Sequence, residues 1–209
     1  MCSISGIFSS SNLVKKIDLM IESQRHRAPD SEGVFNDDNI SIGMGRLKII
    51  DLKSKNLNPI LGKRHVLAYN GEIYNYKELK TELLYLGHKF RTTSDSEVLL
   101  KCWEQWGTKL FSKLNGMYAF CIYDKLKKKL YLARDIVGVK PLYYYHNNKT
   151  KKFIFSSLIK SILISLEKKN LNFDSIISYS NFNRNDYRET FFKDIYKVLP
   201  GELIEFSNG

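Results

Sequence analysis

Two pairs of apolar segments lie so close together in this chain that only one kind of sheet can accommodate them. Met117–Tyr123 is separated from Leu130–Arg134 by DKLKKK, and Leu142–Tyr145 is separated from Phe153–Ser156 by HNNKTKK. Parallel strands need a crossover of a dozen or more residues, whereas antiparallel strands can be joined by a short turn. The sequence therefore predicts two antiparallel hairpins.

The remaining periodic segments complete an α+β pattern. Further strands are expected at Ser3–Phe8, Ile40–Met44, Val66–Tyr69 and Gly201–Phe206, and helices at Leu13–Gln24, Tyr76–Leu86, Ser96–Trp106, Leu158–Leu166 and Asp174–Tyr179. Gly87 and Gly107 are suitable C-terminal caps for the second and third helices. With 209 residues and no internal repeat or linker, the chain is expected to form one domain.

Composition limits the classes of protein. No apolar run is long enough for a membrane span, and no signal peptide is present, so a cytoplasmic protein without a membrane partner is expected. The net charge of +11 raises nucleic acid as a partner. However, the lysines are scattered and no aromatic residues alternate with arginines, which favours a solvated basic surface instead.

The three cysteines are odd in number and far apart, which argues against disulfides and against a metal site. Cys102 and Cys121 lie in apolar helix and strand patterns and are most simply core residues. Cys2 is different, because removal of Met1 would leave a free α-amine beside its thiol. That amine has a pKa near 8 and could act as base for the thiol nucleophile.

Three further features could carry chemistry. Asn70-Gly71 reads first as a hairpin turn, but no clear return strand follows, and its side-chain amide and backbone N–H could instead bind an oxyanion. Ser94 and Glu97 have the spacing of a capping box, and Asp95 between them could bind an ammonium group. Arg46 ends a strand, where it is either a surface charge or a clamp for a carboxylate.

Together these groups suit a zwitterionic amino acid with a reactive carbonyl. Arg46 would bind its carboxylate, Asp95 its ammonium group, and Cys2 would attack the carbonyl while Asn70 and Gly71 stabilise the oxyanion. Acyl transfer from glutamine through a γ-glutamyl thioester, with ammonia as leaving group, fits this combination.

Motifs in order along the chain resemble the class II glutamine amidotransferase domain, especially that of glutamine-hydrolysing asparagine synthetase. They are MCSISGIF, RHRAPDSEG, GRLKIIDL, YNGEIYNY, SDSEVLL, LNGMYAFCIYD and RDIVGVKPLYYY, ending with LPG at 199–201. NGEIYN and the RDxxGxKPLYY pattern favour this branch over glucosamine-phosphate synthase or purine amidotransferase. The resemblance covers residues 2–209.

The resemblance implies an N-terminal-nucleophile hydrolase fold, a four-layer α-β-β-α sandwich of two antiparallel sheets. It assigns the catalytic roles to Cys2, Asn70 and Gly71. Glutamine would be bound by Arg46, Leu47, Lys48, Ile49, Ile50, Asn70, Gly71, Glu72 and Asp95, and residues 25–30 would form the outer wall of the site. No metal or cofactor is implied for glutamine hydrolysis.

The sequence also departs from the family pattern. Ala28 replaces a usual glycine, which would be strained if that position needs positive φ, Met44 replaces a common histidine, and Leu158 replaces a usual glutamate. No pyrophosphate-binding loop of a synthetase occurs, so ATP and magnesium are expected only with a synthetase domain outside this sequence. That domain, or a partner subunit, would receive the ammonia, and a homodimer is left open.

Two alternatives remain at this point. The same glutaminase chemistry could serve another acceptor, such as a sugar or a secondary metabolite. The chain could also be a glutamine-binding module without catalysis, although a scaffold would have no need of Cys2, Asn70 and Asp95.

Overall fold

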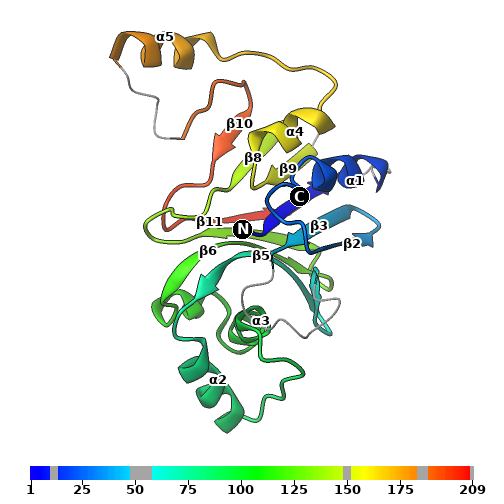
Figure 1. Cartoon of the computed structure of the whole chain (residues 1–209), viewed down its shortest axis with the longest axis vertical. Helices are drawn as coiled ribbons and strands as arrows, with labels where there is room; N and C mark the ends of the chain where they lie inside the picture. The colour runs from blue at the N-terminus through cyan, green and yellow to red at the C-terminus, as the bar shows by residue number, and fades with distance from the viewer. Residues whose placement is uncertain (10–13, 48–57, 148–151, 183–187, 208–209) are drawn as a thin grey trace.

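A computed structural model describes residues 1–9, 14–47, 58–147, 152–182 and 188–207. Two antiparallel sheets lie face to face, with helices on both outer sides (Figure 1). This is the four-layer α-β-β-α arrangement that the resemblance implied, and it confirms the α+β class.

The first sheet has six strands in the order β10-β8-β9-β1-β3-β2. Its strands are β1 (Ser3–Phe8), β2 (Ser31–Asp37), β3 (Ile40–Arg46), β8 (Tyr143–Asn147), β9 (Lys152–Ser156) and β10 (Ile195–Lys197). Strand β1 lies inside this sheet, between β9 and β3, so the N-terminus is held by pairing on both sides.

The second sheet has five strands in the order β11-β7-β6-β5-β4. Its strands are β4 (Ile60–Leu61), β5 (His65–Ile73), β6 (Gly116–Asp124), β7 (Lys129–Arg134) and β11 (Leu203–Ser207). Strands β5 and β6 pair along their whole length, whereas β4 covers only the Val66 and Leu67 end of β5. The other end of β5 therefore has an edge that no described strand pairs with.

Helices cover the outer faces of the two sheets. Helices α1 (Val14–Glu22) and α4 (Ile159–Ser165) pack on the first sheet, and α3 (Asp95–Trp106), followed by the 3₁₀ helix η1 (Gly107–Ser112), packs on the second. Helix α2 (Tyr76–Tyr85) packs against α3. Helix α5 (Phe173–Phe182) instead stands clear of both sheets (Figure 1).

The core follows from the alternation of side chains along β1. Ile4 and Phe8 belong to the large apolar cluster shared with the second sheet, whereas Ile7 belongs to the smaller cluster under α1 and α4. Successive strand residues point to opposite faces, and both faces of β1 are covered. This explains why SISGIF is buried throughout.

Every predicted helix and strand is present, and both predicted hairpins pair antiparallel. The loop of the second hairpin, residues 148–151, lies outside the described residues. Strands β2, β4 and β10 were not predicted, because β2 alternates between half-buried and exposed positions and the other two have only two and three residues. Cys102 and Cys121 are fully buried core residues, as expected.

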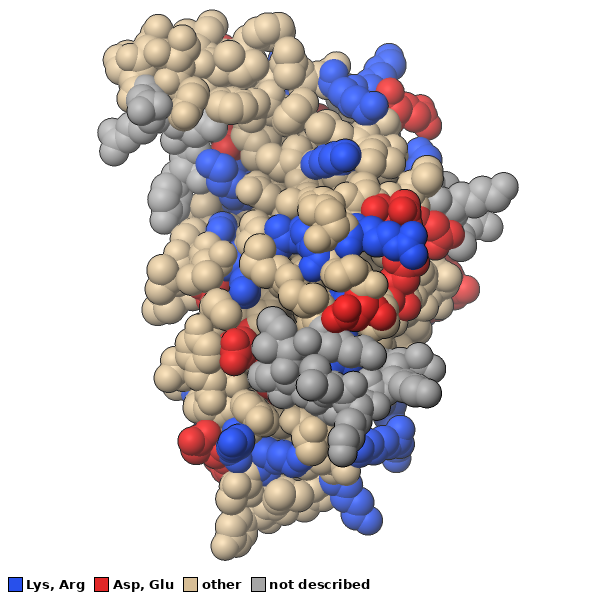
Figure 2. All heavy atoms as spheres, viewed as in Figure 1, with Lys and Arg blue, Asp and Glu red and all other residues tan. Residues whose placement is uncertain are grey.

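On the face in Figure 2, lysine and arginine side chains form several separate groups, most of them with acidic side chains nearby. The described lysine and arginine side chains thus do not form one continuous basic groove on that face. Within the described ranges, no helix is both long and apolar enough to cross a membrane.

Candidate active site

A pocket opens beside the N-terminus and collects residues from both sheets and from α3. It is lined by Met1, Cys2, Met44, Arg46, Leu47, Tyr69, Asn70, Gly71, Glu72, Ser94, Asp95, Ser96, Met117 and Lys140. The seven described residues that the sequence assigned to catalysis or glutamine binding thus line a single pocket. Lys48, Ile49 and Ile50, also assigned to glutamine binding, lie outside the described residues.

Strand pairing fixes the position of Cys2. Ser3 lies opposite Gly45 in the β1–β3 ladder, so the next step along the ladder brings Cys2 beside Arg46 and Leu47. The Cys2 thiol lies 3.7 Å from the carbonyl oxygen of Leu47, to which it donates. An N-terminal residue that would otherwise fray is therefore held at the pocket wall.

The electrostatic surroundings of Cys2 act in opposite directions. Burial raises the pKa of the thiol above its usual value, and the positive charges of the N-terminus and Arg46 oppose this only in part. The N-terminal ammonium belongs to Met1 and donates to the carbonyl of Arg27 at 3.0 Å. With Met1 in place, the nitrogen of Cys2 is a peptide nitrogen without useful basicity.

Asn70 and Gly71 lie inside strand β5, so the hairpin-turn reading of Asn-Gly is wrong. The long ladder with β6, in which Asn70 pairs with Ala119 and Gly71 with Tyr118, outweighs the local preference of Asn-Gly for a turn. Glycine is needed here for another reason. A Cβ atom on Gly71 would lie 2.3 Å from the carbonyl oxygen of Met117.

The backbone N–H of Gly71 points to the open edge of β5. The N–H of Ile73 donates to Asp95 rather than to β6, and the N–H of Tyr118 donates to Asp135 rather than to β5. In an antiparallel ladder, residue pairs joined by hydrogen bonds alternate with pairs that are not. Because the N–H groups of Ile73 and Tyr118 both point away from the ladder, Gly71 and Tyr118 form a pair without ladder hydrogen bonds. The Gly71 N–H is thus directed toward the side where Asp95 lies.

Asn70 adds a second donor at the pocket. Its side chain is 1% exposed, and its amide nitrogen Nδ2 has no hydrogen-bond partner in the part of the chain that the structure describes. Buried polar groups are nearly always paired, so an orphaned donor at a pocket wall needs an explanation. A ligand oxygen in the pocket would satisfy it.

Asp95 is the first residue of α3 and is almost fully buried. Its Oδ2 accepts from the Tyr69 hydroxyl at 2.8 Å and from the Ile73 N–H at 3.1 Å. Burial raises the pKa of Asp95, while these hydrogen bonds oppose the rise. A buried carboxylate oriented in this way can bind a cation in the pocket.

Arg46 ends β3 and is 7% exposed, so it is not the surface charge that its strand-end position also allowed. It lines the pocket with Leu47, and its charge acts on the Cys2 thiol. The pocket thus has a buried guanidinium and a buried carboxylate in its wall. These are complementary to the carboxylate and ammonium groups of an amino acid.

The capping-box interpretation of Ser94 and Glu97 is half right. Ser94 is the N-cap of α3 and accepts from the Ser96 N–H at 3.2 Å. Glu97 instead accepts from the N–H groups of Arg91 and Thr92 and from the Thr92 hydroxyl. Its carboxylate therefore anchors the segment before the helix, two and three residues further back than the N-cap N–H group that a capping box reaches.

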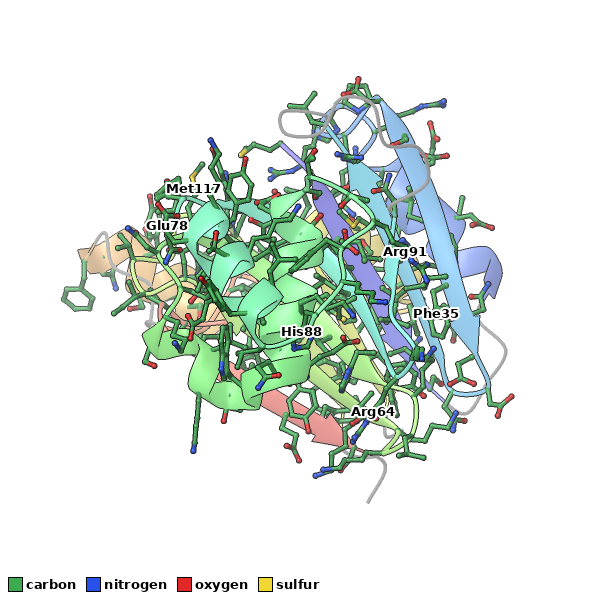
Figure 3. All side chains as sticks on the ribbon, turned by 90° about the horizontal axis from the view of Figure 1, so that it is seen from below. Phe35, Arg64, Glu78, His88, Arg91 and Met117 are labelled. Carbon is green, nitrogen blue, oxygen red and sulfur yellow. The ribbon has the colours of Figure 1, made fainter. Side chains whose placement is uncertain are left out.

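Sequence reasoning missed Tyr69, Met44, Met117 and Lys140 as residues of the pocket wall. Tyr69 and Lys140 lie within or beside motifs that were recognised, so their positions in YNGEIYNY and RDIVGVKPLYYY were the available signal. Met44 and Met117 read as ordinary apolar strand residues. Figure 3 shows Met117 near one edge of the molecule.

One departure from the family pattern, Ala28, has a local explanation. Ala28 is buried against Gly45, and the described residues with positive φ other than glycine are Lys128 and Asp194, so the expected strain at Ala28 is absent. Leu158 is the N-cap of α4 without a side-chain cap bond.

Within residues 25–30, Arg27 contacts Met1 but does not line the pocket.

The pocket wall brings together a thiol, a side-chain amide, a backbone N–H group, a guanidinium and a carboxylate. Among the described residues, no group of three or more His, Cys, Asp or Glu side chains is placed to hold a metal ion.

The chain is similar to several known proteins. A family model described as "Glutamine amidotransferase domain" matches residues 1–209. Two asparagine synthetases (glutamine-hydrolyzing) of Bacillus subtilis, numbers 1 and 3, are each 35% identical to the chain and align with 96% and 99% of it. The chain spans only 33% and 35% of the length of these relatives.

A solved structure gives the same result for the fold. Glutamine phosphoribosylpyrophosphate amidotransferase from B. subtilis superposes with a TM-score of 0.68 over 98% of this chain and 47% of its own. At 19% identity, this likeness supports the shared fold alone.

Proposed function

Because the chain belongs to the glutamine amidotransferase domain family, we propose that it hydrolyses L-glutamine at the pocket beside Cys2 and supplies the ammonia for amidation. The observation that carries this proposal is the joint presence of the Cys2 thiol, the orphaned Asn70 amide and the buried Arg46 and Asp95 in one pocket wall. Each group matches one part of glutamine in its reacting state.

In the proposed reaction, Arg46 and Asp95 bind the α-carboxylate and α-ammonium groups of glutamine. The Cys2 sulfur attacks the side-chain amide carbon, and the resulting oxyanion accepts from the Asn70 amide and the Gly71 N–H. The C–N bond then breaks, and the nitrogen leaves as ammonia after taking up the thiol proton. Water hydrolyses the γ-glutamyl thioester to glutamate and restores the thiol.

The proton transfers require a base beside Cys2, and we assign this role to its own α-amine. Removal of Met1 would create that amine and would also clear the pocket, because Met1 is one of its lining residues.

The acceptor of the ammonia is proposed from the relatives. Because they are named asparagine synthetases, we propose that the complete enzyme amidates aspartate, with ATP and magnesium bound by a separate ATP-dependent unit. This chain spans about a third of those relatives, so that unit would come from the rest of the enzyme or from a partner.

Intact-mass measurement with a diazo-ketone analogue of glutamine tests the glutaminase site. We expect loss of Met1 and addition of one inhibitor mass to the processed protein, competed by glutamine. Cys2→Ala should take up no label, while Cys102→Ala, which changes a buried cysteine of the core, should be labelled like the wild type. A processed wild-type protein that takes up no label and hydrolyses no glutamine would refute the proposal.

A further inference from the structure

A second cavity lies away from the pocket beside Cys2 and shares no lining residue with it. Its volume of about 430 Å³ falls within the range of about 300–1,000 Å³ that is usual for small-molecule sites. It forms where the ends of β8 and α4 meet the starts of β9 and β10, elements that lie together in Figure 1. We call it the lysine cavity, after the lysines in its wall, Lys152, Lys168, Lys169 and Lys193.

The wall of the lysine cavity carries more positive than negative charge. Its two carboxylates, Glu167 and Asp194, leave a surplus of two positive charges. None of the four lysines forms a salt bridge with a described carboxylate. Lys128 and Lys129, in the hairpin of β6 and β7, do form such pairs. An anion in the lysine cavity would supply the missing opposite charge.

Lys152 is the most sheltered of these lysines, since it is half-buried and the other three are exposed. Burial and the positive charge of Lys16 lower the pKa of Lys152, and Glu167 opposes this effect. The Lys16 ammonium is itself held 3.1 Å from the carbonyl oxygen of Ser165, to which it donates. Two repelling ammonium groups are therefore kept close together, and a bound anion would offset their repulsion.

The floor of the lysine cavity is apolar and aromatic. It consists of residues that pack in the smaller apolar cluster: Tyr145, Leu163, Leu166, Phe192 and Ile195. Backbone bonds hold the surrounding segments, because the Lys193 N–H donates to the Asn170 carbonyl at 2.9 Å and the His146 N–H to the Asp194 carbonyl at 3.2 Å. A cavity formed in advance in this way lowers the entropy cost of binding.

We propose that the lysine cavity binds a nucleoside phosphate, with its base against Tyr145 and Phe192 and its phosphate groups on Lys152 and Lys193. A phosphate group carries about −1.5 to −2 charges near pH 7, and lysine is a common phosphate ligand. Aromatic rings provide a surface on which a base can stack. An inorganic anion alone would leave the floor uncovered, and an uncharged ligand would leave the lysines unpaired. The site is additional to the ATP-dependent unit and does not depend on glutamine hydrolysis.

Photolabelling of the complete enzyme with an azidoadenine analogue of ATP tests the proposal. After proteolysis, mass spectrometry should find the label on peptides that contain Tyr145 or Phe192, which separates the lysine cavity from the ATP-dependent unit. ATP should prevent this labelling at lower concentrations than inorganic triphosphate does, and adenosine should be the least effective competitor. The labelling requires no glutamine, so its result is independent of catalysis at Cys2.

Two double substitutions with the same change in net charge show whether the lysines act locally. Lys152→Gln, Lys193→Gln should reduce labelling of these peptides at least about fivefold, because charged hydrogen bonds to phosphate are lost. Lys77→Gln, Lys89→Gln changes exposed lysines in and just after α2 and should stay within about twofold of the wild type, since distant surface charges are screened. Lys152→Arg, Lys193→Arg keeps both charges and should retain labelling.

Three results would overturn the proposal. The first is absence of label from both peptides, and the second is equal labelling of the two glutamine-substituted proteins. The third is a competitor that equals ATP. Inorganic triphosphate as effective as ATP would show that the apolar floor binds no base, and adenosine as effective as ATP would show that the lysines bind no phosphate.

Discussion

At the scale of single residues, the Tyr69–Asp95 pair links the pocket to the sheet beneath it. The Tyr69 hydroxyl and the Ile73 N–H donate to the same oxygen of Asp95, which fixes the orientation of its carboxylate. Because burial, and to a smaller extent the charge of Glu72, raise the pKa of Asp95, each donor helps to keep this group ionised. Tyr69 is therefore a positioning residue for the proposed ammonium site.

Substitution Tyr69→Phe should weaken glutamine binding in a pH-dependent way. Loss of the hydroxyl raises the pKa of Asp95 further, so a larger fraction of this carboxyl is protonated as the pH falls and the acidic limb of kcat/KM moves to higher pH. The KM for glutamine should rise more than kcat falls. Steady-state kinetics of glutamate formation across pH measure both effects.

Tyr123→Phe is the matched control, because that hydroxyl donates to Asp37, at the opposite end of β6 from the pocket residue Met117. It should leave the acidic limb in place. A Tyr69→Phe enzyme whose limb does not move would show that Tyr69 has no role in the ionisation of Asp95.

At the scale of elements, the site depends on one strand edge and one helix start. Strand β5 is paired with β6 along its length but with β4 only at one end, so the edge beside Gly71 and Ile73 is open to α3. Helix α3 begins there, with Asp95 as its first residue and Ser94 as its cap. Glu97 then ties down the segment that leads into the helix.

The Glu97 anchor gives a stability prediction. Substitution Glu97→Gln removes a charged acceptor from the Arg91 and Thr92 N–H groups and should lower the free energy of unfolding by about 1.5–3 kcal/mol. Glu78→Gln changes an exposed glutamate at the same third position of α2 and should have little effect. Denaturant unfolding of the three proteins measures the difference, and equal stabilities would rule out the anchoring role.

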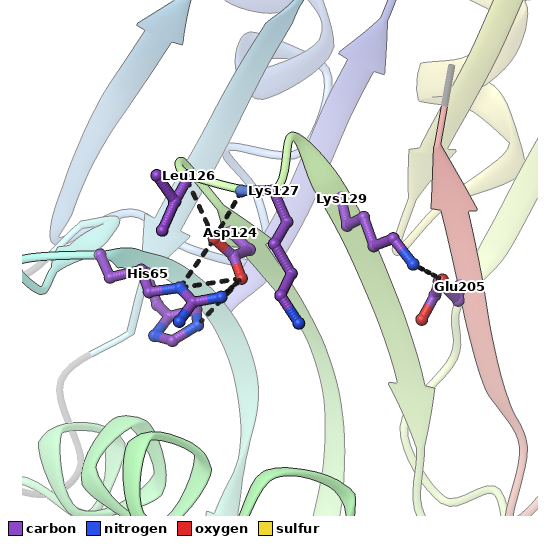
Figure 4. Close-up of polar contacts among 7 residues, drawn as sticks. His65, Asp124, Leu126, Lys127, Lys129 and Glu205 are labelled. Carbon is purple, nitrogen blue, oxygen red and sulfur yellow. Dashed lines mark hydrogen bonds and ion pairs between the residues drawn. The ribbon is translucent and has the colours of Figure 1, made fainter. Parts of the chain in front are cut away.

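At the scale of the whole molecule, a polar cluster around Asp124 stabilises the end of β6 that lies away from the pocket. Asp124 accepts from the Arg64 guanidinium at 2.6 Å and from the N–H groups of Leu126 and Lys127 at 3.0 Å (Figure 4). Figure 3 shows Arg64 and the pocket residue Met117 toward opposite edges of the molecule, in line with their places at opposite ends of the β5–β6 ladder. The cluster joins the residue before β5 to the turn between β6 and β7.

The Asp124 cluster predicts how stability depends on acid. The Arg64 and backbone hydrogen bonds outweigh burial and lower the pKa of Asp124 to about 2, from an ordinary value of 3.8. The unfolded chain therefore takes up this proton first as the pH falls, so the stabilisation is complete above about pH 4 and is lost between about pH 4 and pH 2.

Asp124→Asn should be less stable than the wild type at pH 5, and the difference should shrink as the pH falls toward 2. Urea unfolding at pH 5, 4 and 3 provides the measurement, with the exposed Asp18→Asn as control. A difference between wild type and Asp124→Asn that stays constant over this range would contradict the lowered pKa.

The sequence by itself determined the local features of this protein. Hairpin lengths, apolar periodicity and helix caps predicted the antiparallel strands and the helices, because these signals act between residues close together in the chain. The same local reading singled out Cys2, Asn70, Gly71 and Asp95, since a nucleophile and paired donors or charges stand out in short motifs.

Only the tertiary structure decided how these groups meet. The ladder with β6 placed Asn-Gly in a strand instead of a turn, the β1–β3 register buried Arg46 beside Cys2, and packing of α3 on the edge of β5 paired Tyr69 with Asp95. Each of these contacts joins residues more than 25 positions apart or overrides a local preference. Sheet register and helix packing set such contacts, and no single short motif encodes either.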